Sequence, residues 1–98
     1  MTKSYELYEG IISALTYILN LNITSKGDVV FKIVNILKDS DMSESDLISV
    51  RKMIDLLTQE TLDMSEINRS LMEIVDVKFL SSFLDYVQTE CLYKHCPR

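Results

Sequence analysis

The residues best suited to chemistry lie together at residues 91–96, which contain both cysteines and the single histidine of the sequence. Cys91 and His95 are four residues apart, so on a helix they share a face and could bind one metal ion, with Cys96 close by. A structural zinc site needs four ligands, and the chain has no further cysteine or histidine. We therefore predict free thiols, with no metal or cofactor, unless a symmetric dimer pools these ligands.

The same residues could also act as a nucleophile and its base. A catalytic pair needs an orienting third group and an oxyanion hole on a rigid scaffold, and the following residues, up to Arg98, offer neither. A disulfide between Cys91 and Cys96 would require distortion, because residues five apart on a helix are too distant. The sequence has no Gly-rich phosphate loop, and nothing in it indicates a small-molecule substrate. We predict that the protein is not an enzyme.

A second candidate site is the segment at residues 39–46, which contains four carboxylates and three serines. Its carboxylates could dock against a basic surface of a partner protein, because negative charge accelerates association by electrostatic steering. The predicted partner-binding residues are Asp39, Asp41, Glu44 and Asp46. The alternative interpretation is a solvated, well-capped turn between two helices.

A third candidate site is apolar and lies near the end of the sequence, at Phe79, Phe83, Leu84, Tyr86 and Val87. On a helix, Phe79 and Tyr86 fall outside the stripe that the other three residues form with Leu80. Aromatic residues outside a core are common interface anchors, so we predict that this set binds a partner or a second copy of the chain. The alternative is a wide buried face, or a bend in the helix, that accommodates all of them.

These candidate sites lie on helices that the spacing of apolar residues predicts along the whole chain. The sequence has only two glycines and one proline, and apolar residues recur at intervals of three and four. The predicted helices cover residues 4–20, 25–38, 43–57, and from 63 or 65 onward, with a break near residues 76–78. The fold class is therefore all-α, as one domain at residues 1–98 that forms a small bundle of four to five helices.

Capping residues and apolar stripes support these helix boundaries. Ser4, Ser25 and Ser43 are candidate N-caps, and either Asp63 or Ser65 can cap the last third of the chain. The inward stripe predicted for the third helix consists of Leu47, Val50, Ile54 and Leu57, with Met53 beside it.

The composition favours association with another protein chain. Hydrophobic residues make up 47% of the 98 residues, and a chain this short buries only roughly 60–65% of its unfolded surface. The apolar surplus predicts a self-association surface or a groove for a partner, and a homodimer is the expected form. The alternative is a well-packed monomer that exposes scattered apolar side chains.

The charge balance argues against direct nucleic-acid binding. The net charge is −5 and the isoelectric point is near 4.7, whereas binding to a phosphate backbone needs a positive stripe. Residues 11–19 are apolar, but acidic residues precede them and they are too few to span a bilayer. We expect a cytoplasmic protein with no membrane association.

One stretch of the chain carries a family resemblance. It begins with Asn22-Ile23 and Lys26, continues as an apolar helix to Leu37, and then has Ser40-Asp41, Asp46-Leu47-Ile48, Arg51-Lys52 and Leu56-Leu57. In these features, residues 22–57 resemble the YmgB/AriR family of small enterobacterial regulators of biofilm formation and acid stress. Lys38 stands where that family has an acidic residue, and residues 58–98 have no counterpart. The resemblance implies a helical homodimer that acts in regulation through protein partners or, less directly, DNA.

Two functional hypotheses follow. The first is a non-enzymatic regulatory or adaptor protein that dimerises or binds one specific protein by burying exposed apolar side chains. The second is a small acidic inhibitor, such as an immunity protein or a phage, viral or plasmid-borne factor, that masks a functional surface of its target.

Overall fold

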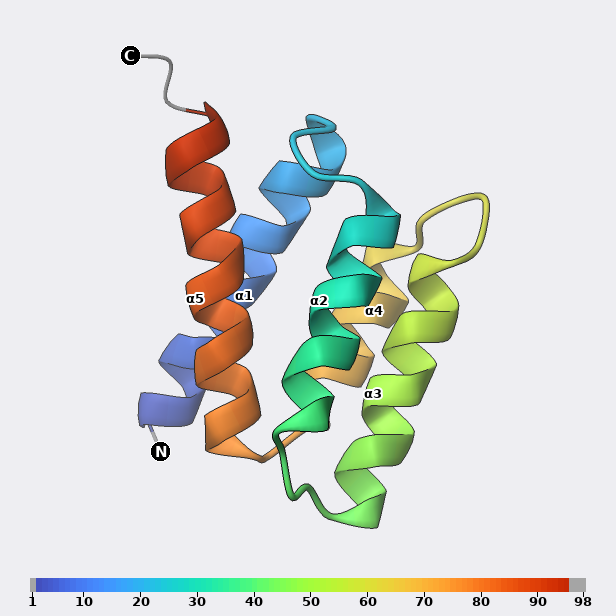
Figure 1. Cartoon of the computed structure of the whole chain (residues 1–98), viewed down its shortest axis with the longest axis vertical. Coiled ribbons are helices and arrows are strands. Elements are labelled where there is room, and N and C mark those ends of the chain that lie inside the picture. Colours follow the sequence, from blue (N-terminus) through green and yellow to red (C-terminus); the bar gives the residue numbers. More distant parts are fainter. Residues whose placement is uncertain (1, 96–98) are drawn as a thin grey trace.

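Five helices make up most of the described chain. The computed structural model describes the backbone of residues 2–95 and the side chains of residues 5–92. The helices are α1 (Thr2–Asn20), α2 (Lys26–Lys38), α3 (Glu44–Leu57), α4 (Met64–Met72) and α5 (Val77–His95). Residues 2–95 contain no strand, so the predicted all-α bundle is confirmed (Figure 1).

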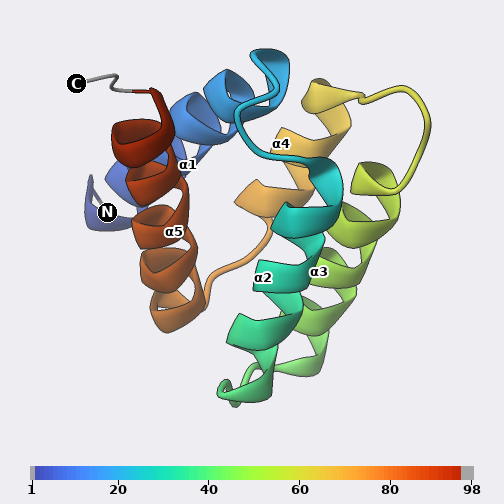
Figure 2. The same cartoon turned by 45° about the horizontal axis from the view of Figure 1, so that its top comes forward.

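The helices form two groups that share one core. α1 crosses α5 and packs extensively against it, and α3 packs extensively against α4. α2 contacts both α3 and α5 and so joins the two groups, as Figure 2 shows. α2 and α3 run side by side in opposite directions, joined by the loop at residues 39–43 (Figure 1). None of the helices in the described range is long and apolar enough to cross a membrane.

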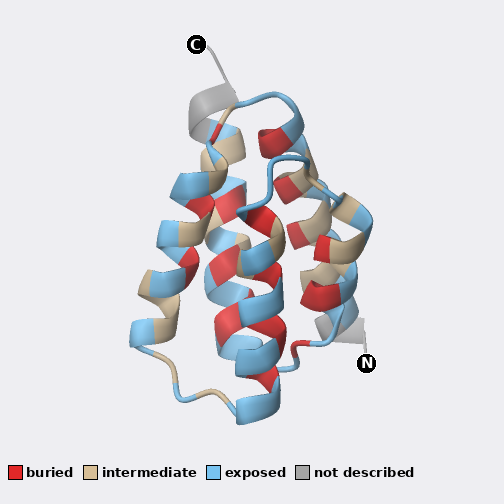
Figure 3. Ribbon diagram, turned by 90° about the vertical axis from the view of Figure 1, so that its right-hand side faces the viewer, coloured by how far each residue is buried: buried red, intermediate tan, exposed pale blue. Residues whose placement is uncertain are grey.

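The core is formed by buried apolar residues from every helix and from the linker between α4 and α5. Figure 3 shows the buried positions on the sides of the helices that face one another. The buried apolar side chains are Ile11, Leu15, Ile18, Leu19, Val29, Ile33, Val50, Met53, Leu57, Ile67, Leu71, Ile74, Phe79, Leu80, Phe83 and Val87. Of the seven apolar residues of α2, Val29 and Ile33 are buried, Val30, Ile36 and Leu37 are half-buried against the core, and Phe31 and Val34 are exposed.

Side-chain caps begin three of the helices as predicted. Ser25, Ser43 and Asp63 each accept a hydrogen bond from the backbone N–H three residues later, at 3.1, 3.2 and 3.3 Å. Each bond satisfies a donor that the first turn of a helix leaves without an intrahelical partner. The predicted cap at Ser4 is wrong, because α1 already begins at Thr2.

The predicted break before the last helix is also present. α4 ends at Met72 and α5 begins at Val77, so the break begins a few residues before the expected position. The Asp76 carboxylate accepts a hydrogen bond from the backbone N–H of Phe79 at 2.9 Å, which satisfies a donor in the first turn of α5. The linker between these two helices also forms hydrogen bonds with side chains of α3.

Candidate interaction surfaces

The apolar set on α5 is mostly core. Phe79, Phe83 and Val87 have no exposed surface, and the ring centroids of the two phenylalanines lie 5.8 Å apart. The assignment of Phe79 to an accessible contact surface is therefore wrong, and the alternative of a wide buried face holds for this residue. The physical reason is that α1 and α2 cover α5 from two sides, so α5 buries a wider face than a single stripe. These three residues do not form an accessible contact surface in the single chain.

The other two members of the set, Leu84 and Tyr86, are half-buried. Leu84 lies against Gly10 of α1, because a Cβ atom built on Gly10 would be 2.9 Å from Leu84 Cδ1. The Tyr86 ring stacks on Phe83 at 6.5 Å between centroids, and the Lys32 Nζ of α2 lies 5.7 Å from the Tyr86 centroid. Both residues therefore connect helices of the same chain.

The environment of Tyr86 also shifts its ionisation. Burial, together with the nearby carboxylates of Glu90 and Asp28, raises the pKa of its hydroxyl to about 12. Glu90 has a second role, since its Oε1 accepts a hydrogen bond of 2.8 Å from the Oγ1 of buried Thr24. This end of α5 is thus tied to the turn between α1 and α2.

The acidic segment divides into an exposed part and a buried part. Asp39, Asp41 and Glu44 are exposed around the loop and at the start of α3, where a partner can reach them. Asp46 is only 2% exposed, and its Oδ1 accepts a hydrogen bond of 3.2 Å from the backbone N–H of Val75. The placement of Asp46 on a docking surface is therefore wrong. Asp46 instead holds the linker between α4 and α5.

A polar network surrounds this buried carboxylate. The Tyr8 hydroxyl of α1 donates a hydrogen bond to the Ile74 carbonyl, and Ser49 Oγ of α3 donates to Glu73 Oε1 at 3.1 Å. The same Glu73 oxygen lies 3.6 Å from the Lys52 ammonium. Burial raises the pKa of Tyr8, and the charge of Asp46 raises it further. The network therefore anchors the linker to both α1 and α3.

This network explains why α3 is rotated relative to its predicted orientation. Val50, Met53 and Leu57 face the core together with Asp46 and Ser49. Ile54 is half-buried and packs against the core as predicted, whereas Leu47 is exposed, so the predicted stripe is wrong at Leu47. Polar side chains can occupy a core-facing stripe when they find hydrogen-bond partners there. Asp46 and Ser49 have such partners in the linker between α4 and α5.

This rotation leaves Leu47 exposed beside Ile48 on α3, while α2 exposes Phe31 and Val34. We call Phe31 and Val34 of α2, with Leu47 and Ile48 of α3, the α2–α3 face. All four side chains are exposed, with Phe31 at 67% and Ile48 at 52%. The loop that joins these two helices lies at one end of the pair (Figure 1), and we call its exposed carboxylates, Asp39, Asp41 and Glu44, the acidic loop. Sequence patterns did not locate this face, because apolar residues cover a wide arc of α2 and their spacing does not show which of them meet the core.

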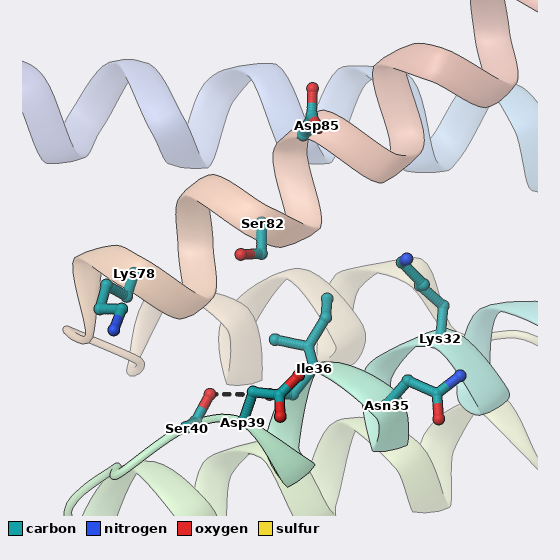
Figure 4. Close-up of a pocket in the computed structure, with 8 residues that line it drawn as sticks. All are labelled: Lys32, Asn35, Ile36, Asp39, Ser40, Lys78, Ser82 and Asp85. Atoms are coloured by element: carbon teal, nitrogen blue, oxygen red, sulfur yellow. Dashed lines mark hydrogen bonds between the residues drawn. The ribbon is translucent and has the colours of Figure 1, made fainter.

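A polar groove separates α2 from α5 on another side of the molecule (Figure 4). It has a volume of about 460 Å³ and is lined by Lys32, Asn35, Ile36, Asp39, Ser40, Lys78, Ser82 and Asp85. Its two lysines and two aspartates give no net charge, and Ser40 is engaged because its Oγ donates to the Ile36 carbonyl at 2.8 Å. Within the described residues, no cluster of histidine, cysteine and acidic side chains is arranged to hold a metal ion.

The predicted thiol site is described only in part. Cys91 is half-buried against α1, and its Sγ donates to the Ala14 carbonyl at 3.7 Å. Burial raises the pKa of the Cys91 thiol, and the charge of Glu90 adds to this shift, so the neutral thiol is favoured. The side chains of His95 and Cys96 lie outside the described residues.

Together, these features define a small all-α protein with an exposed apolar face and an acidic loop beside it. No family model matches the chain, and no curated protein or solved structure is significantly similar to it. The resemblance of residues 22–57 to the YmgB/AriR family stays a prediction.

Proposed function

We propose that this protein is a non-enzymatic regulator or adaptor that acts by binding protein, and that the α2–α3 face is its contact surface. The observation that carries the proposal is the exposure of Phe31, at 67%, beside exposed Val34 on a helix whose other apolar residues pack on the core. Large aromatic residues with apolar neighbours are typical centres of protein interfaces, because they bury much area on contact.

Self-association is the leading form of this function. A homodimer would cover the α2–α3 face permanently and would account for the high apolar content of a 98-residue chain. The function would then reside in the dimer, which presents the acidic loop of each copy to a further protein.

The second candidate function is inhibition of a target protein by masking. It is favoured by the exposure of Asp39, Asp41 and Glu44 at one end of the α2–α3 face. Such a group of carboxylates can orient the protein on a basic target surface while the apolar face forms the contact. In this form the protein is monomeric in isolation, and its association with the target slows as the salt concentration rises.

Surface substitutions test the proposal without disturbing the core. Phe31→Lys and Ile48→Lys introduce charge on the α2–α3 face, and we expect both to weaken binding to the partner or to a second copy by at least about tenfold. Leu92→Lys is the matched control, because Leu92 is 64% exposed and belongs to α5, outside the face. Equal binding by all three variants and the wild type would refute the α2–α3 face as the contact surface. Circular dichroism checks that each variant keeps its fold.

A further inference from the structure

Four exposed residues form one stripe along the outer side of α3. Glu44, Leu47, Ile48 and Arg51 follow one another at intervals of three, one and three residues, which places them on the same side of a helix. All four are exposed. The stripe is turned away from the core, because Met53 and Leu57 mark the buried side of α3.

Two copies of this stripe are complementary to each other when they run in opposite directions. Its centre lies between Leu47 and Ile48, and Glu44 and Arg51 are equally far from that centre with opposite charges. A two-fold axis through this centre pairs two α3 helices in antiparallel fashion, so that each residue of one copy meets its counterpart on the other. Glu44 of each copy then lies opposite Arg51 of the other, and the apolar residues meet in the middle. Packed helices are about 8–10 Å apart, a gap that a glutamate and an arginine side chain can bridge.

The charges at the ends of the stripe are available for such contacts. Neither Glu44 nor Arg51 forms an ion pair among the residues whose side chains are described. The neighbouring Lys52, by contrast, lies 3.6 Å from Glu73 of its own chain. Arginine is enriched in protein interfaces, because its flat guanidinium can stack on apolar groups while it binds a carboxylate.

The pattern also selects one orientation. A parallel pairing of the same stripes would place Glu44 beside Glu44 and Arg51 beside Arg51, and like charges in contact are destabilising. The antiparallel pairing gains two attractive pairs instead. Phe31 and Val34 are exposed on α2, which packs beside α3, so they are available to extend the apolar contact.

We propose that a second copy of this chain occupies the α2–α3 face through antiparallel pairing of the two α3 helices, with Glu44 of each copy bound to Arg51 of the other. This inference rests on the proposed function, since it names the occupant of the same face. It goes further in specifying the symmetry, the register and the residues that determine them.

Charge reversal tests the register directly. Glu44→Arg replaces two attractive pairs by two repulsive ones in the symmetric dimer, and so does Arg51→Glu. Rim pairs contribute up to about 1 kcal/mol each, so we expect either variant to raise the dimer dissociation constant by about tenfold or more. The double variant Glu44→Arg/Arg51→Glu restores both pairs with the charges exchanged, and its dissociation constant should return to within about threefold of the wild type.

Mixing the two single variants gives a second, independent test. In the mixed dimer, one chain carries arginine at both positions and the other carries glutamate at both, so both cross-chain pairs are attractive. We expect each single variant alone to have the mass of one chain at a concentration at which an equimolar mixture has the mass of two chains. Sedimentation velocity with differently labelled chains measures this directly.

The control uses a similar pair of charges elsewhere on the surface. Lys78 and Asp85 of α5 are also exposed and seven residues apart, so Lys78→Glu and Asp85→Arg should leave the dissociation constant unchanged. The inference is overturned if the wild type keeps a single-chain mass up to millimolar concentration, or if it dimerises with equal affinity in all these variants. In either case a loss of partner binding in Phe31→Lys would still support the proposed function, so the two failures are distinguishable.

Discussion

Substitution of Asp46 provides the sharpest test of the fold. Asp46 is a buried carboxylate of α3, whereas the sequence predicts it on an exposed docking surface. Its Oδ1 accepts a hydrogen bond from the Val75 backbone N–H at 3.2 Å, and its own backbone N–H donates to Ser43 Oγ at 3.2 Å. Asp46→Ala removes the first bond and leaves the second intact. The variant therefore isolates the contribution of one carboxylate to the position of the linker between α4 and α5.

The expected magnitude follows from two terms. A hydrogen bond to a charged group contributes about 1.5–3 kcal/mol, and a carboxylate in the first turn of a helix contributes about 0.3–1 kcal/mol through the helix dipole. We therefore expect Asp46→Ala to lower the free energy of unfolding by about 2–4 kcal/mol. For a domain of this size, each kcal/mol corresponds to roughly 4–8 °C in melting temperature.

Two further variants make this prediction specific. Asp46→Asn keeps an acceptor oxygen in the same place, so it should lose only about 1 kcal/mol. Asp41→Ala removes an exposed carboxylate of the same acidic segment and should change stability by less than about 0.5 kcal/mol. Urea unfolding followed by circular dichroism, at a single protein concentration, measures all three. Equal stability of Asp46→Ala and the wild type would refute the structural role of Asp46, as would an Asn variant as unstable as the Ala variant.

Three other predictions concern α5. The pKa of Tyr86 is raised to about 12 in the folded chain, against about 10 in the unfolded chain. The contribution of Tyr86 to stability is therefore complete below about pH 10 and is lost as the pH rises from about 10 towards 12. Tyr86→Phe should flatten this decline in alkaline unfolding experiments. Gly10→Ala should be nearly neutral in the wild type, where Leu84 must move aside, and stabilising by about 0.5–1 kcal/mol in a Leu84→Ala background. In a Cys96→Ser variant, Cys91 should react with iodoacetamide at pH 8 at least about tenfold more slowly in the folded chain than in urea, because burial raises its pKa.

Each of these predictions can fail in a distinct way. A decline in stability between pH 10 and 12 that is as steep in Tyr86→Phe as in the wild type would show that another group dominates that range. Additive effects of the Gly10 and Leu84 substitutions would contradict the close approach of α1 and α5. Equal alkylation rates in buffer and in urea would show that Cys91 is accessible in the folded chain.

The helix boundaries were largely predictable because they depend on short-range interactions. The caps at Ser25, Ser43 and Asp63 involve a side chain and a backbone N–H only three residues away. The break before α5 lies close to the segment where the apolar pattern changes, at residues 76–78. Such local chemistry is encoded within a few residues, so the sequence by itself determines that the chain forms helices and approximately where most of them start and stop.

The assignment of residues to core or surface was predictable only in part, because it depends on where the helices pack. Phe79 is buried since α5 is covered on two sides, and Leu47 is exposed since the polar network around Asp46 rotates α3. The partner of Asp46 lies 29 residues away in the chain, and no local pattern encodes such a pairing. For the same reason, the sequence predicts an apolar contact surface on α5, whereas we propose one on the α2–α3 face. Helical periodicity identifies which residues share a side of a helix, whereas only the tertiary structure decides which side meets the core.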